Sequence, residues 1–169
     1  MQARLVDELQ DHLVLAIAWN KKDFYGQEQL FGEAVAQRFP DATFDIKEAG
    51  NCYAVGRYTA CVFHLMRTLE IGLGVFGTEF GLTLGHTNWY PFIEQIESRI
   101  RDLGKAAKTS AEKTKHEFYA QTTSSFMFLK DAWRNYTAQA RGKYTEEEAE
   151  TILRNVKAFM LKLADGVRP

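Results

Sequence analysis

Apolar side chains recur at alternating spacings of three and four residues along most of this chain, which is the period of a helix with one buried face. No run alternates apolar and polar residues as a half-buried strand would. We therefore predict an all-α fold, an antiparallel helical bundle of about five to six helices. The clearest helix is expected from about Ala49 to Phe76, with its buried stripe formed by Val55, Tyr58, Val62, Leu65, Leu69, Gly72 and Phe76.

The chain has 169 residues, of which 46% are hydrophobic, so it is long enough for a core and short enough for one domain. We expect a single helical domain over 1–169, with a core over 49–169 and an N-terminal helical addition over 1–48. A first helix is expected over 5–17. A second, short helix is expected to stop before Pro40, because proline disfavours the helical conformation in the residue before it.

Three helices are expected after residue 76. The first is capped by Asn88 and closed by Gly104, a basic linker extends to Lys115, and the second ends near Gly142. Capping boxes are expected for the last two helices, formed by Thr109 with Glu112 and by Thr145 with Glu148. The expected buried faces are Ile93, Ile96, Ile100 and Leu103, then Tyr119, Phe126 and Trp133, and finally Ala149, Ile152, Val156, Phe159 and Leu163.

The charge is nearly balanced overall but uneven along the chain. The formal net charge is -1, so there is no general attraction to phosphate polymers. Residues 1–48 hold five Lys or Arg against nine Asp or Glu, whereas residues 49–169 hold sixteen against thirteen. Any anion-binding surface is therefore expected in the later part of the chain.

The two cysteines and the apolar segments indicate a reducing, non-membrane environment. Cys52 and Cys61 are expected on one helix, about 13 Å apart along its axis and on opposite sides, so that they could not pair. Without a secretory apolar segment at the N-terminus, a cytoplasmic location with reduced thiols fits best. The apolar run from Leu65 to Leu84 is interrupted by charges and glycines, which argues against a membrane span.

Metal and cofactor sites are not expected from the residue spacing. No two histidines stand three or four residues apart, and no Glu-x-x-His sequence occurs, so a zinc or di-iron site is not predicted. The glycines between 72 and 85 lack the Lys-Ser/Thr that follows a phosphate-binding loop. The four histidines are His12, His64, His86 and His116.

A short polar motif near the end of the second-last helix is the most informative functional feature. The sequence from 133 to 144 reads WRNYTAQARGKY, in which Arg134-Asn135 is followed by Gln139. This resembles the arginine-to-histidine motif of HEPN-domain ribonucleases, with Gln139 where the histidine belongs. The resemblance extends over roughly 49–165, through the order of the long helices and the Glu-rich start of the last one.

The resemblance implies a bundle that dimerises and binds RNA in a cleft between subunits, where RNA is cut without a metal. Arg134 would stabilise charge on the phosphate and Asn135 would orient it. Gln139 occupies the position of the general base, but an amide has no useful proton affinity near neutral pH, so activity is expected to be weak or absent. The weaker candidates for contacts to RNA are His64, Arg141, Lys143 and Tyr144.

Two alternatives are compatible with the same residues. Gln139 is either natural or a replacement for a catalytic histidine. The chain could instead be a non-catalytic dimeric helical module that binds a nucleotide or a partner protein, such as an antitoxin or a nucleotidyltransferase. In that case His64 is a partly exposed structural histidine, Arg67 pairs with Glu70, and Arg134 pairs with Asp131 one turn earlier.

Overall fold

The chain folds into a helical bundle, which confirms the all-α prediction. The computed structural model describes residues 14–85, 89–138 and 142–167, with the backbone alone from 130 to 138. Within these residues there is no strand. The helices are the 3-10 helix η1 (Trp19–Phe24), α2 (Glu33–Arg38), the 3-10 helix η2 (Pro40–Ala42), α3 (Thr43–Ala54), α4 (Tyr58–Thr78), α5 (Trp89–Ala106), α6 (Ser110–Ala138) and α7 (Glu146–Gly166).

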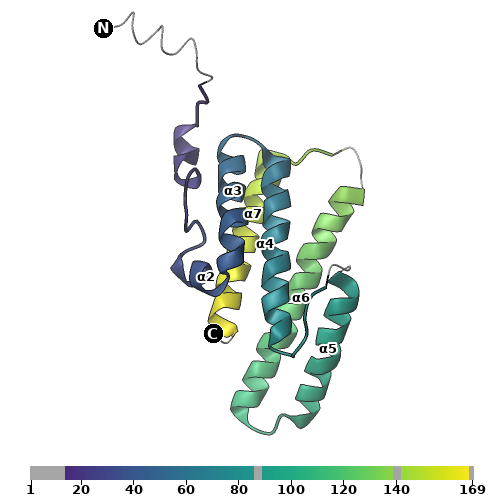
Figure 1. Ribbon diagram of the computed structural model, residues 1–169. Coiled ribbons are helices and arrows are strands. Elements are labelled where there is room, and N and C mark those ends of the chain that lie inside the picture. Colours follow the sequence, from purple (N-terminus) through teal and green to yellow (C-terminus); the bar gives the residue numbers. More distant parts are fainter. Residues whose placement is uncertain (1–13, 86–88, 139–141, 168–169) are drawn as a thin grey trace, which may run out of the picture.

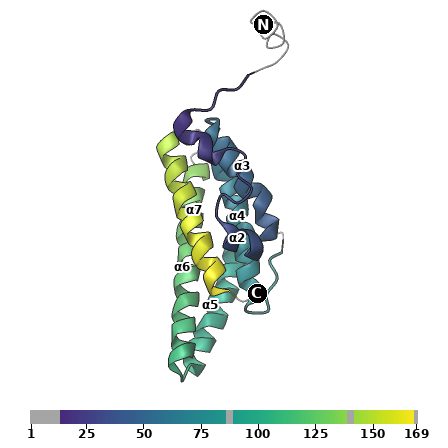
Figure 2. The same cartoon turned by 90° about the vertical axis from the view of Figure 1, so that its left-hand side faces the viewer.

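The helices are arranged as one group of three and a hairpin. Helices α3, α4 and α7 pack side by side, and α2 lies against α7 (Figure 1). Helix α5 and the first half of α6 form an antiparallel hairpin that extends past the end of α4 (Figure 1). The second half of α6 returns to the bundle, where it runs along α7 (Figure 2). The turns that join α3 to α4 and α6 to α7 therefore lie at the same end of the molecule.

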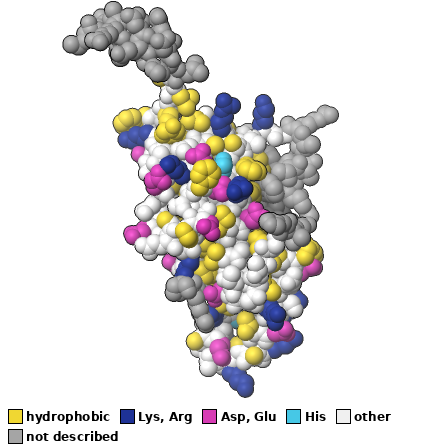
Figure 3. Space-filling view, in the orientation of Figure 1, with side chains coloured by type: hydrophobic (Ala, Val, Ile, Leu, Met, Phe, Trp, Pro, Cys, Tyr) yellow, Lys and Arg dark blue, Asp and Glu magenta, His cyan; other side chains and the backbone are white. Residues whose placement is uncertain are grey.

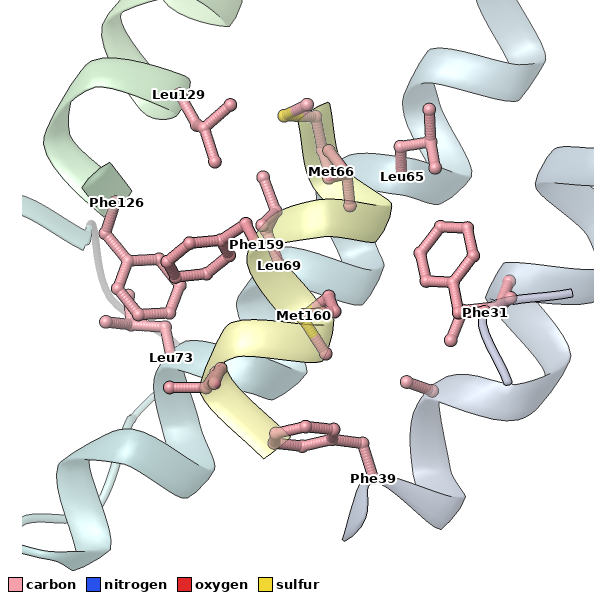
Figure 4. Packing of buried hydrophobic residues seen from close by; sticks show 14 of the residues in the cluster. Phe31, Phe39, Leu65, Met66, Leu69, Leu73, Phe126, Leu129, Phe159 and Met160 are labelled. Carbon is pink, nitrogen blue, oxygen red and sulfur yellow. The ribbon is translucent and has the colours of Figure 1, made fainter. Parts of the chain in front are cut away.

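Helix α7 runs through the middle of the core. Figure 4 shows Phe126 and Leu129 of α6 on one side of α7, and Phe31 and Phe39 of the N-terminal part on the other. Phe31 and Phe39 are completely or almost completely buried, and they belong to the same hydrophobic cluster as the long helices. The boundary expected between residues 48 and 49 falls inside α3, so the N-terminal part shares a helix and a core with the rest.

The single helix predicted from Ala49 to Phe76 is wrong, because the chain reverses at Gly56. Helix α3 ends at Ala54, and Gly56 has φ +73°, a left-handed conformation that ends helices and favours glycine. The N–H of Arg57 then donates to the carbonyl of Cys52 at 2.7 Å. The apolar period continues across the turn because α3 and α4 each bury a face in the same core.

This turn also overturns the argument about the cysteines. Cys52 lies on α3 and Cys61 on α4. A separation calculated along a single helix axis therefore cannot decide whether the two cysteines pair. Both are free thiols. Burial, with a smaller contribution from Cys52, raises the pKa of Cys61 to about 12, so this thiol is protonated at neutral pH.

Several predicted helix ends also differ from the structure. Residues 14–18 are not helical, and the rest of the predicted first helix lies outside the described residues. Helix α5 continues through Gly104 to Ala106, which shortens the linker to 107–109, and Leu103 is 47% exposed rather than buried. On α7, Leu153 is buried and Ile152 only partly so. Asn88 lies outside the described residues, and so do residues 139–141, which separate Ala138, the last described residue of α6, from Gly142.

Both predicted capping boxes are confirmed. The backbone N–H of Glu148 donates to the Thr145 hydroxyl, and the Glu148 carboxylate accepts from the Thr145 N–H at 2.8 Å. Thr109 and Glu112 make the same reciprocal pair at the start of α6. These local hydrogen bonds satisfy N–H groups that a helix start leaves without partners, which explains why the sequence predicts them well.

Lys21 joins the N-terminal segment to the bundle through a hydrogen bond and an ion pair. Its Nζ donates to the Tyr58 hydroxyl at 2.9 Å and lies 2.9 Å from Glu146 Oε1, and the Tyr58 hydroxyl donates to Glu146 Oε2 at 2.6 Å. Burial opposes the charge on Lys21, but Tyr58 and Glu146 together raise its pKa, while Tyr58 and Lys21 lower the pKa of Glu146. This contact joins η1 to the first turns of α4 and α7.

Helix α4 has the length and composition of a membrane-spanning helix, but its position is that of a core helix. In the most apolar stretch of α4, which is 18 residues long, 56% is buried inside the structure. Helices α3 and α7 cover it from two sides. The hydrophobicity of α4 is therefore explained by the core of the bundle.

A substitution at Gly50 is expected to destabilise the packing of the N-terminal segment on α3. A Cβ at Gly50 would lie 2.5 Å from the carbonyl oxygen of Phe24 and 2.7 Å from Leu30 Cδ2. Because the first of these atoms is backbone, Gly50→Ala should lower the free energy of unfolding by about 1–3 kcal/mol. Urea unfolding followed by circular dichroism measures the change.

The matched control is Gly74→Ala on α4. A Cβ at Gly74 meets only Leu84, at 3.8 Å, which is ordinary contact. Alanine is the better helix former, so this variant should be unchanged or more stable by about 0.5–1 kcal/mol. If Gly50→Ala and Gly74→Ala are equally stable, the backbone of Phe24 does not pack closely against Gly50.

Candidate functional site

A carboxylate, an imidazole and a guanidinium meet where the start of α3 packs against α4. The Asp45 carboxylate is buried, with 2% of the residue exposed. Its Oδ1 lies 2.8 Å from Nδ1 of His64, and Arg67 Nε donates to Oδ1 at 2.9 Å and to Oδ2 at 3.1 Å. His64 and Arg67 are three residues apart, which places them on one face of α4. We call this group the Asp45 cluster.

Asp45 holds the imidazole of His64 in a defined orientation. A carboxylate next to Nδ1 favours the tautomer in which Nδ1 carries the proton, and this tautomer leaves a lone pair on Nε2. The His64 side chain is 20% exposed, so solvent reaches the ring. An imidazole held in this way can accept or donate a proton at Nε2, and it can also form a hydrogen bond to a ligand there.

Two exposed phenylalanines flank His64. Phe44 is 67% exposed and Phe63 is 55% exposed, and each precedes a residue of the Asp45 cluster in the sequence. The Phe44 and Phe63 ring centroids lie 6.3 Å and 5.8 Å from that of His64, with interplanar angles of 76° and 78°. Figure 3 shows this face, with a histidine over α3 and α4 among hydrophobic side chains and charges of both signs.

The charges of the Asp45 cluster largely cancel. Asp45 and Arg67 carry opposite charges, so with a neutral His64 the cluster has no net charge. The Arg67 side chain is 54% exposed, which leaves the outer part of its guanidinium accessible. It borders a shallow hollow of about 450 Å³ that also contacts Asp41 and Glu70. Arg67 thus pairs with Asp45 across two helices, in place of the pair with Glu70 that the sequence suggested.

The side chains of most residues of the predicted motif lie outside the described part of the structure. The backbone places Arg134 and Asn135 within the last two turns of α6, which ends at Ala138. Their side chains, the proposed Arg134–Asp131 pair, and Gln139 and Arg141 fall outside the described residues. Their expected roles stay predictions.

Three of the weaker candidates are described. His64 belongs to the Asp45 cluster, and Lys143 is exposed in the connection from α6 to α7. Tyr144 is buried in the core, and burial raises its pKa. Its backbone N–H donates to the Thr59 hydroxyl at 3.3 Å, which joins the connection to the first turn of α4. The contacts of Lys143 and Tyr144 with RNA stay predictions.

The sequence gives no sign of Asp45, Phe44 or Phe63 as site residues. Asp45 and His64 are 19 residues apart on different helices, and they meet only because the chain reverses at Gly56. The prediction of one long helix excluded that contact. The sequence also does not predict that Phe44 and Phe63 are exposed, since a phenylalanine in a helix is more often part of the core.

A second polar group lines a hollow of about 580 Å³ at the opposite end of the molecule, near the turn between α5 and α6. The Tyr119 hydroxyl donates to Glu79 Oε2 at 2.7 Å, and Lys115 Nζ lies 3.8 Å from the same oxygen. Glu112, in the same hollow, accepts from the N–H groups of Thr109 and Lys108. The Asp45 cluster is the stronger candidate because it combines a histidine held by a carboxylate with two exposed aromatic rings.

Comparisons of this chain with family models, with curated proteins and with solved structures found no match.

Proposed function

We propose that this chain is a HEPN-like protein of the metal-independent endoribonuclease lineage, of the toxin or phage-defence type. It acts as a cytoplasmic dimer that binds RNA, and it cuts RNA weakly or not at all because Gln139 stands at the histidine position. Arg134 binds phosphate and Asn135 orients it. The proposal rests on the motif, and one structural observation supports it.

That observation is the position of α6, the helix that carries the motif, relative to the ends of the other helices. Helix α6, which carries Arg134 and Asn135, ends at the same end of the bundle as the first turn of α4, and Tyr144 bonds to Thr59 there. His64 lies less than two turns further along α4, held by Asp45. The helix that carries the motif and the helix that carries the imidazole held by Asp45 therefore reach the same end of the bundle, which supports the proposal.

The chemistry requires proton transfer and charge stabilisation. A base takes the proton of a ribose 2'-hydroxyl, the 2'-oxygen attacks the phosphorus, and the bond from phosphorus to the 5'-oxygen breaks as that oxygen gains a proton. An arginine stabilises the extra negative charge on the phosphate as it forms. The Gln139 amide can form hydrogen bonds but cannot take the proton, so binding of RNA is expected to outlast cleavage.

Arg134→Ala is expected to weaken RNA binding by about tenfold or more, because a hydrogen-bonded charge pair with phosphate contributes about 1.5–3 kcal/mol. Fluorescence anisotropy with a labelled RNA measures the dissociation constant. Arg154→Ala is the matched control, since Arg154 is an exposed arginine of α7 whose only described ion pair is with Glu150, at 3.9 Å. If both variants bind RNA as the unchanged protein does, Arg134 is not a phosphate-binding residue. A protein that is strictly monomeric at micromolar concentration would also contradict the proposal.

One surface favours the second candidate function, a non-catalytic module that binds a partner protein. Phe128 is 70% exposed on α6 and borders a shallow hollow of about 500 Å³ between α6 and α7. Leu129 and Phe159 line the same hollow, and an apolar surface groove of this kind is suited to a protein contact, either with a second copy or with an antitoxin or nucleotidyltransferase. This candidate is preferred if the protein and its Gln139→His variant neither bind nor cut RNA.

A further inference from the structure

We propose that Phe44 and Phe63 hold one unpaired RNA base against His64, and that Arg67 contacts the adjoining phosphate. The ligand is therefore an unstacked nucleotide of a single-stranded segment. This inference rests on the proposed function, and it assigns a binding surface to α3 and α4, whereas the Arg134 motif belongs to α6.

The first argument is the exposure of the two rings. Phe44 and Phe63 each keep more than half of their surface in water, although both helices have a buried face available. The ring planes of Phe44 and Phe63 make angles of 76° and 78° with the plane of the His64 imidazole, and both ring centroids lie within 6.3 Å of the imidazole centroid. Three aromatic rings from two helices thus meet at one point of the surface. Aromatic side chains arranged around a solvent-accessible point are the usual stacking platform for nucleobases.

The second argument is the chemistry of the polar groups between the rings. Asp45 uses both oxygens on His64 and Arg67, so it does not present a free carboxylate to a ligand. What remains accessible is the outer guanidinium of Arg67 and the imidazole edge of His64. A guanidinium donates to phosphate oxygens, and a neutral imidazole can pair with the polar edge of a base. Asp45 is a positioning residue here, because it acts only through the two side chains that it holds.

The third argument limits the ligand to about one nucleotide. Asp41 and Glu70 lie around the same hollow as Arg67, and they would repel a run of phosphates. With Arg67 partly neutralised by Asp45, stacking rather than charge should supply most of the affinity at this surface. A base inside a duplex is already stacked between its neighbours, so only an unpaired base can enter.

The test compares matched phenylalanine variants on single-stranded and duplex RNA. Phe44→Leu and Phe63→Leu remove the rings but keep apolar side chains, and Tyr90→Leu is the control because Tyr90 is an exposed aromatic residue of another helix, α5. We expect Phe44→Leu and Phe63→Leu each to weaken binding of a short single-stranded RNA by about fivefold to a hundredfold. Tyr90→Leu should leave the dissociation constant unchanged, and a duplex of the same sequence should bind more weakly than the single strand. Circular dichroism confirms that each variant is folded.

A base analogue reports the contact directly. The fluorescence of 2-aminopurine in the RNA should change on binding to the unchanged protein, because the base stacks on a ring, and this change should be lost in the variant that lacks both Phe44 and Phe63. The dimer content of each variant is measured by sedimentation in the same buffer.

The outcomes separate this inference from the proposed function. If RNA binding depends on Arg134 but is the same for Phe44→Leu, Phe63→Leu and Tyr90→Leu, the base-binding surface is wrong and the proposed function stands. If duplex RNA binds as tightly as the single strand, the inference is also wrong. If Phe44→Leu or Phe63→Leu instead converts a dimer to monomer, a second copy covers this surface and the inference fails. If neither the protein nor its Gln139→His variant binds RNA, the proposed function fails as well.

Discussion

Gln139→His is expected to raise the rate of RNA cleavage by about a hundredfold to ten thousandfold, the usual contribution of a general acid or base. The reason is the difference between an amide and an imidazole. The Gln139 amide cannot accept a proton near neutral pH, whereas a histidine can take the 2'-hydroxyl proton and release it again. Single-turnover cleavage of a labelled RNA in the presence of EDTA measures the rate and keeps the reaction independent of divalent metal.

Two control variants make this experiment decisive. Gln139→Asn keeps an amide and should cut no faster than the unchanged protein. The double variant Gln139→His with Arg134→Ala should return to the low rate, because the phosphate charge is no longer stabilised. Growth of cells that express Gln139→His gives a parallel result, since an active toxin slows growth. If Gln139→His and Gln139→Asn cut at the same rate, the ribonuclease lineage is wrong.

Phe126→Ala is expected to lower the free energy of unfolding by about 3–5 kcal/mol, because removing a buried phenylalanine leaves a cavity that its neighbours only partly fill. The Phe126 residue has no exposed surface. Its ring centroid lies 4.6 Å from that of Phe159 on α7 and 5.9 Å from that of Phe76 on α4, so it joins three helices. For a chain of this size the melting temperature should fall by roughly 6–20 °C, as measured by differential scanning calorimetry.

Phe128→Ala is the control, on the same helix and two residues further along. Phe128 is 70% exposed, so its truncation should change the free energy of unfolding by no more than about 0.5 kcal/mol. The comparison holds residue type and helix constant and varies only burial. A similar loss for both variants would mean that the face of α6 assigned to the core is wrong.

The buried faces of the helices were largely predictable from local patterns. Val62, Leu65, Leu69 and Phe76 lie on the predicted stripe of α4, and each is fully buried. The capping boxes at Thr109 and Thr145 were predicted with equal success. Both kinds of feature depend on residues within about four positions of each other, so the sequence contains the whole interaction.

Predictions that depended on the path of the chain were less successful. The apolar period runs unbroken from α3 into α4, which concealed the reversal at Gly56 and led to one helix where there are two. The same period suggested that Leu103 is buried, whereas the α5–α6 hairpin extends past the bundle and leaves it exposed. The residue types around Gly56 are compatible with one helix or two, and Leu103 could be buried or exposed. The packing of the neighbouring helices decides between these alternatives.

The sequence alone determined that this protein is helical, which faces of its helices are apolar, and that Arg134-Asn135 is followed by a glutamine with no useful proton affinity. These properties follow from residue type and from spacing along one helix. Only the tertiary structure joined Asp45 to His64 and Arg67 and left Phe44 and Phe63 exposed beside them. The physical reason is that a contact between helices depends on where the chain turns and on what packs against each face, and neither is a property of a local stretch of residues.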